Sequence, residues 1–301
     1  MRGSLLTLGV AVVTAAAISA CAHGERRFST LARGDAAIDT VHDYEVGRVM
    51  LYSGLGQYER MHRVAPESPT GLLLLTRGWS QAGWWFVEDD WEVATDLGDD
   101  EVAEDARTRA RGAYTRAVFY GLELLEHKAQ DFDHVRTNPE QLRSWLHTFD
   151  GSDAETLLWT GWAWLGRSAM SPDIPSLSDG AKVGVALIER AIELDEGVHH
   201  GLAHAALGSW YARSATAPSL ESSRRHFERA LQLGQRKYLS TQVLYARSWY
   251  CLRNDEQGYV RLLQEVLDAG DPLPEQRLAN VAAQRRARRY LTDVRMADCG
   301  L

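Results

Sequence analysis

The hydrophobic positions of this chain recur every three or four residues, the spacing of amphipathic helices, and one such pattern occurs twice. Glu-Arg-Ala-Ile-Glu-Leu at residues 189–194 returns 39 residues later as Glu-Arg-Ala-Leu-Gln-Leu at residues 228–233, with another apolar helix expected between them at 201–212. A two-helix unit that recurs after roughly 34 to 45 residues is typical of helical-repeat arrays, in which each pair stacks on its neighbours. The pattern therefore predicts an all-α fold made of helix pairs.

The same spacing predicts a single helical-repeat domain over residues 34–301. We expect helix pairs at about 71–127, 154–194, 201–233 and 240–269, preceded at 34–61 by one or two helices broken near Gly54 or Gly56. Residues 171–180 hold two prolines, so a long non-helical turn is expected there. A basic helix at 275–293 should cap the array and turn its arginines to water; these are Arg285, Arg286, Arg288 and Arg289.

Aligning the pairs gives a common register. The first helices share a small residue, and the second helices share a small or β-branched one. The first set is Gly78, Gly161, Gly208 and Ala246, and the second is Ala117, Ala191, Ala230 and Val266. A small side chain at such a position lets two helices approach closely. This register resembles the tetratricopeptide repeat in a degenerate form, because the tryptophan usual early in the first helix is missing.

The N-terminus has the pattern of an export signal. Arg2 precedes an apolar run at residues 5–18 that is too short for a comfortable membrane span. Residues 18–21, Ile-Ser-Ala-Cys, resemble the lipobox of bacterial lipoproteins, which implies a signal peptide at 1–20, cleavage before Cys21, and lipidation of Cys21. Several acyl chains anchor a protein stably. The alternative is an ordinary secretory signal in which Cys21 is incidental.

These features predict a lipid-anchored protein of the bacterial envelope that faces the periplasm. Residues 21–33 are polar and are expected to be a tether between the lipid and the fold. Ala22 does not resemble the aspartate that signals inner-membrane retention in some bacteria, which favours the outer membrane. The formal net charge of −8 makes nucleic acid an unsuitable partner. For Cys251 and Cys299 we expect two separate thiols rather than a disulfide.

The candidate chemistry is sparse. An acidic cluster over residues 88–101 is read as a solvated turn ahead of a helix rather than a calcium site, because the ligand order of calcium loops is absent. His200 and His204 stand one helical turn apart, but no third zinc ligand is indicated. Hydrolase and nucleotide-binding glycine motifs are absent. We therefore expect no enzyme activity, no metal and no cofactor.

Tryptophans are the most suggestive side chains. Trp84 and Trp85 are adjacent and point about 100° apart on a helix, so both are difficult to bury on one narrow stripe. Burial between stacked helices is the ordinary reading for any one of them. The alternative is a concave apolar surface for a partner or a lipophilic ligand, lined by Trp84, Trp85, Trp159, Trp162, Trp164 and Trp210.

Taken whole, the chain resembles the TatT family, the lipoprotein T component associated with tripartite ATP-independent periplasmic (TRAP) transporters. The resemblance is carried by residues 72–75, 84–90, 107–123, 159–164, 187–195, 201–211 and 277–287. It implies an all-helical trimer that binds, without catalysis, a periplasmic substrate-binding P subunit carrying a hydrophobic ligand. The alternative is a tetratricopeptide lipoprotein that assembles outer-membrane proteins or envelope polymers.

Overall fold

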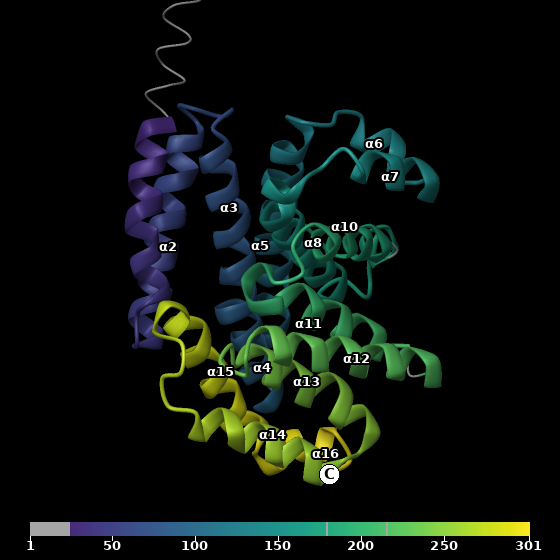
Figure 1. Ribbon diagram of the computed structural model, residues 1–301. Helices are drawn as coiled ribbons and strands as arrows, with labels where there is room; N and C mark the ends of the chain where they lie inside the picture. Colours follow the sequence, from purple (N-terminus) through teal and green to yellow (C-terminus); the bar gives the residue numbers. More distant parts are fainter. Residues whose placement is uncertain (1–24, 179, 215) are drawn as a thin grey trace, which may run out of the picture.

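The computed structural model describes residues 25–301 except 179 and 215, and over those residues it consists of helices joined by turns (Figure 1). No strand occurs among them, which confirms the predicted fold class. The predicted signal peptide at 1–20 and the predicted lipidation site Cys21 lie outside the described residues. Within the described range, no helix is both long and apolar enough to cross a membrane.

The first described segment packs on the domain. Residues 25–39 are helical, and the buried ring of Phe28 lies so close to α3 (Pro69–Gln81) that a Cβ at Gly71 would come within 2.7 Å of it. The expected tether at 21–33 is therefore wrong for residues 25–33. The next helix, α2 (Tyr44–His62), runs through Gly54 and Gly56 without a break. The break expected there occurs instead at residues 40–43, where Asp43 caps α2.

The chain then forms four hairpins. In the first, α3, the π-helical segment η1 (Ala82–Val87) and α4 (Glu88–Asp96) make one continuous arm that packs on α5 (Asp100–Glu126). The second pairs α8 (Ala154–Ala169) with α10 (Ala181–Leu194), and the third pairs α11 (Val198–Ala212) with α12 (Ala217–Leu233). The fourth pairs α13 (Ser240–Tyr245) and the π-helical η3 (Ala246–Tyr250) with α14 (Glu256–Asp268). Their assignment as tetratricopeptide repeats stays a prediction.

Glycine permits the close helix contact in the second and third hairpins. A Cβ at Gly161 would lie 2.6 Å from Cγ1 of Ile188, and one at Gly208 would lie 2.8 Å from the ring of Phe227. Ile188 and Phe227 are themselves fully buried. The expectation that a small residue in these first helices lets the two helices approach closely is confirmed at both positions, and the structure adds that a large side chain of the second helix fills the space.

The segments between the hairpins hold short helices. α6 (Phe132–Val135) and α7 (Pro139–Leu146) lie between the first and second hairpins. Residues 171–180, expected to be non-helical, contain the four-residue helix α9 (Pro175–Ser178). That expectation was wrong because proline is tolerated at the first position of a helix, where its missing N–H has no partner to lose.

The hairpins stack in series, with α5 on α8, α8 and α10 on α11, and α11 on α13. Figure 1 shows the array curving so that the C-terminal helix α15 (Arg277–Tyr290) returns to the beginning of the fold, where it packs against α2 and η1. The two ends of the array are therefore in contact.

Buried ion pairs hold the ends together. We call the set Asp89, Glu92, Arg286, Arg289 and Tyr290 the clasp. Arg289 pairs with both carboxylates, and Tyr290 Oη donates to Glu92 Oε1 at 2.8 Å. Arg286, only 1% exposed, donates to the carbonyl of Trp84 at 2.6 Å.

The clasp corrects two expectations. The acidic cluster is a solvated turn at Asp99, Asp100 and Glu101, where Asp99 caps α5, but Glu88, Asp89 and Glu92 are buried. Likewise Arg285 and Arg288 are exposed, whereas Arg286 and Arg289 turn inward. Both corrections have one cause. Because α15 lies against the arm that carries the acids, the arginines of α15 and the carboxylates of the arm shield each other from solvent.

The C-terminus is fixed by a disulfide between Cys251 and Cys299. Cys251 begins the short helix η4 (Cys251–Arg253), and Cys299 follows α16 (Asp293–Asp298). The expectation of two separate thiols was wrong because α16 folds back on the fourth hairpin, which brings together residues 48 positions apart. Sequence spacing alone carries no information about such a return.

Candidate functional site

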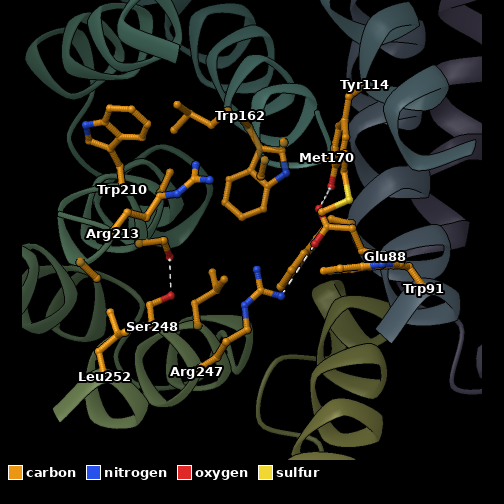
Figure 2. A pocket seen from close by; sticks show the side chains of 18 residues that line it. Glu88, Trp91, Tyr114, Trp162, Met170, Trp210, Arg213, Arg247, Ser248 and Leu252 are labelled. Carbon is orange, nitrogen blue, oxygen red and sulfur yellow. Dashed lines mark hydrogen bonds and ion pairs between the residues drawn. The ribbon is translucent and has the colours of Figure 1, made fainter. Parts of the chain in front are cut away.

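A cavity of about 520 Å³ opens between the consecutive hairpins (Figure 2). Four tryptophans border it: Trp84, Trp91, Trp162 and Trp210. Half of the remaining lining residues are apolar and come from α8, α11 and the fourth hairpin, namely Leu165, Ala169, Met170, Ala206, Ala212, Leu244 and Leu252. We call this space the tryptophan cavity.

Both π-helical segments of the described chain border this cavity. η1 supplies Trp84, and η3 supplies Arg247 and Ser248. A π-helical turn inserts a residue into an α-helix and re-aims the side chains around it, and such turns are frequent at functional sites. Here the two turns lie in separate hairpins and contribute to the same wall. The sequence showed no signal for either of them.

The six predicted groove tryptophans separate into two groups. Trp84 and Trp162 are nearly buried and meet edge to face with ring centroids 5.7 Å apart, while Trp210 is partly exposed; all three line the tryptophan cavity. The other three do not line it and are buried elsewhere among the hairpins; these are Trp85, Trp159 and Trp164. Adjacent Trp84 and Trp85 are both buried because the arm from α3 to α4 is covered on more than one side.

One end of the cavity is acidic. Glu88 is 4% exposed; its Oε1 accepts a hydrogen bond from Tyr114 Oη, and its Oε2 has no hydrogen-bond partner among the described residues. Burial raises the pKa of Glu88, and the nearby Arg247 guanidinium opposes that rise. Arg247 Nη1 lies 3.8 Å from Glu88 Oε2 but only 2.6 Å from Glu92 Oε1 in the clasp. Arg247 is therefore a cation already neutralised by acids.

The opposite side of the cavity carries a second cation, Arg213, which differs from Arg247 in its surroundings. Figure 2 shows Trp210, Arg213 and Ser248 along one side and Glu88 with Tyr114 across from them. The Arg213 guanidinium lies 5.7 Å from the Trp210 ring centroid, is exposed, and forms no ion pair with any acid in the described part of the chain. Ser248 Oγ donates to Ser209 Oγ at 3.3 Å on the same wall. Sequence reasoning missed all three polar residues, because isolated arginines and serines have no distinguishing pattern.

The histidines do not converge on a metal site. His200 stacks on Tyr238 with ring centroids 5.6 Å apart, whereas His204 Nδ1 lies 2.8 Å from His226 Nδ1 and its Nε2 lies 3.2 Å from Glu196. Over the residues that the structure describes, no three His, Cys, Asp or Glu side chains are placed to hold a metal ion.

The tryptophan cavity has an apolar wall and a few polar groups that could orient a ligand. This arrangement fits the binding of an organic molecule.

Comparison with known proteins gives the chain a family. A curated relative from Treponema pallidum (strain Nichols), described as an uncharacterized protein, is 27% identical over 194 residues. That match covers 62% of this chain and 60% of the relative, so the chain spans about three fifths of the relative's length. A family match extends over residues 41–297 and takes in all four hairpins, the tryptophan cavity and the clasp. The chain therefore belongs to the TAtT family, the TRAP transporter T-component.

Proposed function

We propose that this protein is a lipid-anchored periplasmic scaffold that binds the substrate-binding P subunit of a TRAP transporter and receives its hydrophobic ligand in the tryptophan cavity. Membership of the T-component family associates the chain with TRAP transporters. The family is an accessory part of a transport system, and the proposed role is accordingly binding without catalysis. The trimer implied by the TatT resemblance is part of the same proposal.

The tryptophan cavity is the observation that carries the ligand part of the proposal. Its volume of about 520 Å³ lies within the range of roughly 300–1,000 Å³ found for small-molecule sites. Such sites combine a mostly apolar lining with a few polar groups, and this lining has four tryptophans beside Glu88, Arg213 and Arg247. A lipophilic molecule would replace water against aromatic surface, which favours binding.

The envelope location is supported by a second observation. Disulfides persist in oxidising compartments such as the bacterial periplasm and are rare in the cytosol. The Cys251–Cys299 bond therefore suits a domain held on the periplasmic side by lipid on Cys21. Placement in the outer membrane remains part of the proposal.

The partner is tested by affinity purification of the full chain from its native envelope after mild cross-linking, with the bound proteins identified by mass spectrometry. Recovery of a TRAP P subunit is the expected result. Recovery of a barrel-assembly complex without transporter subunits would favour the alternative, an assembly factor for the outer membrane.

The cavity is tested separately with N-phenyl-1-naphthylamine, an uncharged apolar probe that fluoresces when bound. Trp210→Ala should lower probe affinity because Trp210 forms part of the cavity wall. Trp79→Ala is the matched control, since Trp79 is a partly buried tryptophan with an arginine over its ring but lies outside the cavity and outside both π-helical segments. Equal losses in both variants, or no loss in either, would remove the cavity from the proposed function.

A further inference from the structure

The charges that face the tryptophan cavity are not balanced. Three charged side chains line it, Glu88, Arg213 and Arg247. Glu88 and Arg247 lie within 3.8 Å of each other, and Arg247 also pairs with Glu92. Arg213 forms no ion pair with an acid among the described residues, and the Glu88 carboxylate acts on it only from beyond ion-pair distance. The cavity therefore offers one positive charge that a ligand could neutralise.

Arg213 is part of a polar corner that also contains Ser209 and Ser248. The two hydroxyls lie 3.3 Å apart on the cavity wall, between α11 and η3, on the same side of the cavity as Arg213 (Figure 2). A guanidinium with neighbouring hydroxyl donors matches a carboxylate, which accepts charge-assisted hydrogen bonds on both of its oxygens. A neutral ligand would gain less from this corner, and a cationic ligand would be repelled by it.

The rest of the lining fixes the orientation. From the polar corner the cavity passes Trp162 and reaches Met170, Tyr114 and the buried carboxyl of Glu88 on the far side (Figure 2). A carboxylate at the Glu88 end would meet another acid, whereas an apolar tail would meet aromatic rings and the thioether. The tail therefore enters first, and the acid group stays at the exposed corner.

We propose that the ligand of the tryptophan cavity is an apolar monocarboxylic acid whose carboxylate binds Arg213, Ser209 and Ser248 while its hydrocarbon body lies against Trp162 and Trp84. This rests on the proposed ligand-binding function and deepens it by naming the head group. Arg213 becomes the residue that selects acids over alcohols and amines of the same length.

The test compares octanoate, 1-octanol and octylammonium, which share one alkyl body. Each is titrated calorimetrically into the full chain in nanodiscs, with the heat of empty nanodiscs subtracted. Octanoate should bind tightest and octylammonium weakest. Arg213→Gln should weaken octanoate binding about 1.5-fold to fivefold, the range expected for one charged pair near a surface, and leave octanol binding unchanged. Arg213→Lys, which keeps the charge, should recover part of the loss.

The matched control is Arg253→Gln. The Arg253 guanidinium lies 5.2 Å from the Trp249 ring centroid, also without an ion pair in the described residues, but it borders no part of the tryptophan cavity. This variant should change none of the three affinities. Because Arg213 and Arg253 are both exposed, both variants should keep the thermal unfolding midpoint of the unsubstituted protein.

Each other outcome is decisive. If octanoate and octanol bind equally, or if Arg213→Gln has no more effect than Arg253→Gln, the acid head group is refuted while octanol binding still supports an apolar cavity. If neither octanoate nor octanol binds, the ligand part of the proposed function is refuted as well. Recovery of the P subunit in the separate purification is unaffected by either result.

Discussion

Replacing Asp89 by asparagine should destabilise the fold far more than the same change at the adjacent Asp90. The Asp89 carboxylate is 1% exposed; it accepts hydrogen bonds from Tyr44 Oη at 3.0 Å and Arg285 Nε at 2.7 Å, and it pairs with Arg289. Asparagine keeps the size of the side chain but removes the charge and turns an NH₂ group toward guanidinium donors. Several buried or half-buried cations then lose their counter-charge.

Two estimates give the loss of folding free energy expected for Asp89→Asn. Burial alone would raise the pKa of Asp89, but the arginines of the clasp lower this pKa from 3.8 to about 2. At about 1.4 kcal/mol per pKa unit, this difference corresponds to about 2 kcal/mol of folding free energy at neutral pH. Removing one partner of a buried ion pair costs about 3–5 kcal/mol in measured cases. Asp89→Asn should therefore cost about 2–5 kcal/mol.

Asp90 provides the control because it is the next residue and also pairs with an arginine. Its partner Arg48 lies 2.7 Å away, but the two side chains keep 28% and 23% of their surface exposed. Asp90→Asn should cost about 1 kcal/mol or less. Urea unfolding followed by circular dichroism at pH 7 compares the midpoints of both variants with that of the unsubstituted protein.

The pH dependence gives a second readout with a defined sign. The pKa of Asp89 is lowered in the folded protein, so its contribution is complete above the unfolded value near 4 and is lost as the pH falls toward 2. The stability difference between the unsubstituted protein and Asp89→Asn should shrink over that window. A midpoint shift no larger than that of Asp90→Asn, or a difference that stays constant to pH 2, would refute the clasp as described.

Three further predictions follow from individual contacts. Gly208→Ala should cost about 1–3 kcal/mol in urea unfolding because its Cβ would press on the Phe227 ring, whereas Gly56→Ala, with nothing within 4 Å, should be neutral or slightly stabilising. The double variant Cys251→Ser with Cys299→Ser should lose about 2–4 kcal/mol, and adding reductant should destabilise the unsubstituted protein but not the variant. Burial lowers the pKa of His226 from 6.5 to about 4, so the unfolded chain binds a proton that the folded chain does not, and stability should fall by about 1 kcal/mol as the pH drops through this window. In a pH series of urea midpoints, His226→Gln should flatten that decline; an unchanged slope would contradict the assignment.

The features predictable from the sequence are those that depend on neighbours along one helix or one hairpin. Apolar spacing indicated the helices, and the shared register identified Gly161 and Gly208 as positions where two helices come close, because both contacts arise within a hairpin. The resemblance to the TatT family followed from the same local stretches, and the family match over residues 41–297 confirms it.

The long-range contacts could not be predicted from the sequence, and the reason is physical. Glu92 and Arg289 are 197 positions apart, so nothing along a single helix shows that each neutralises the other. Read locally, an acidic turn and a basic terminal helix both look solvated, and the return of α15 to the arm buries part of each, namely Asp89 and Glu92 with Arg286. The disulfide between Cys251 and Cys299 was not predicted for the same reason, because its two residues are far apart in the sequence. Trp85, Trp159 and Trp164 were grouped with Trp84 by residue type, and only the packing of the hairpins separates them.

The clasp and the tryptophan cavity share Arg247. Its Nη1 donates to Glu92 at 2.6 Å, and its guanidinium lies over the ring of Trp84 at 5.2 Å, so it faces both the ion pairs and the cavity. Glu92 of α4 thus neutralises Arg247, which leaves Arg213 as the cation available to the proposed ligand head group.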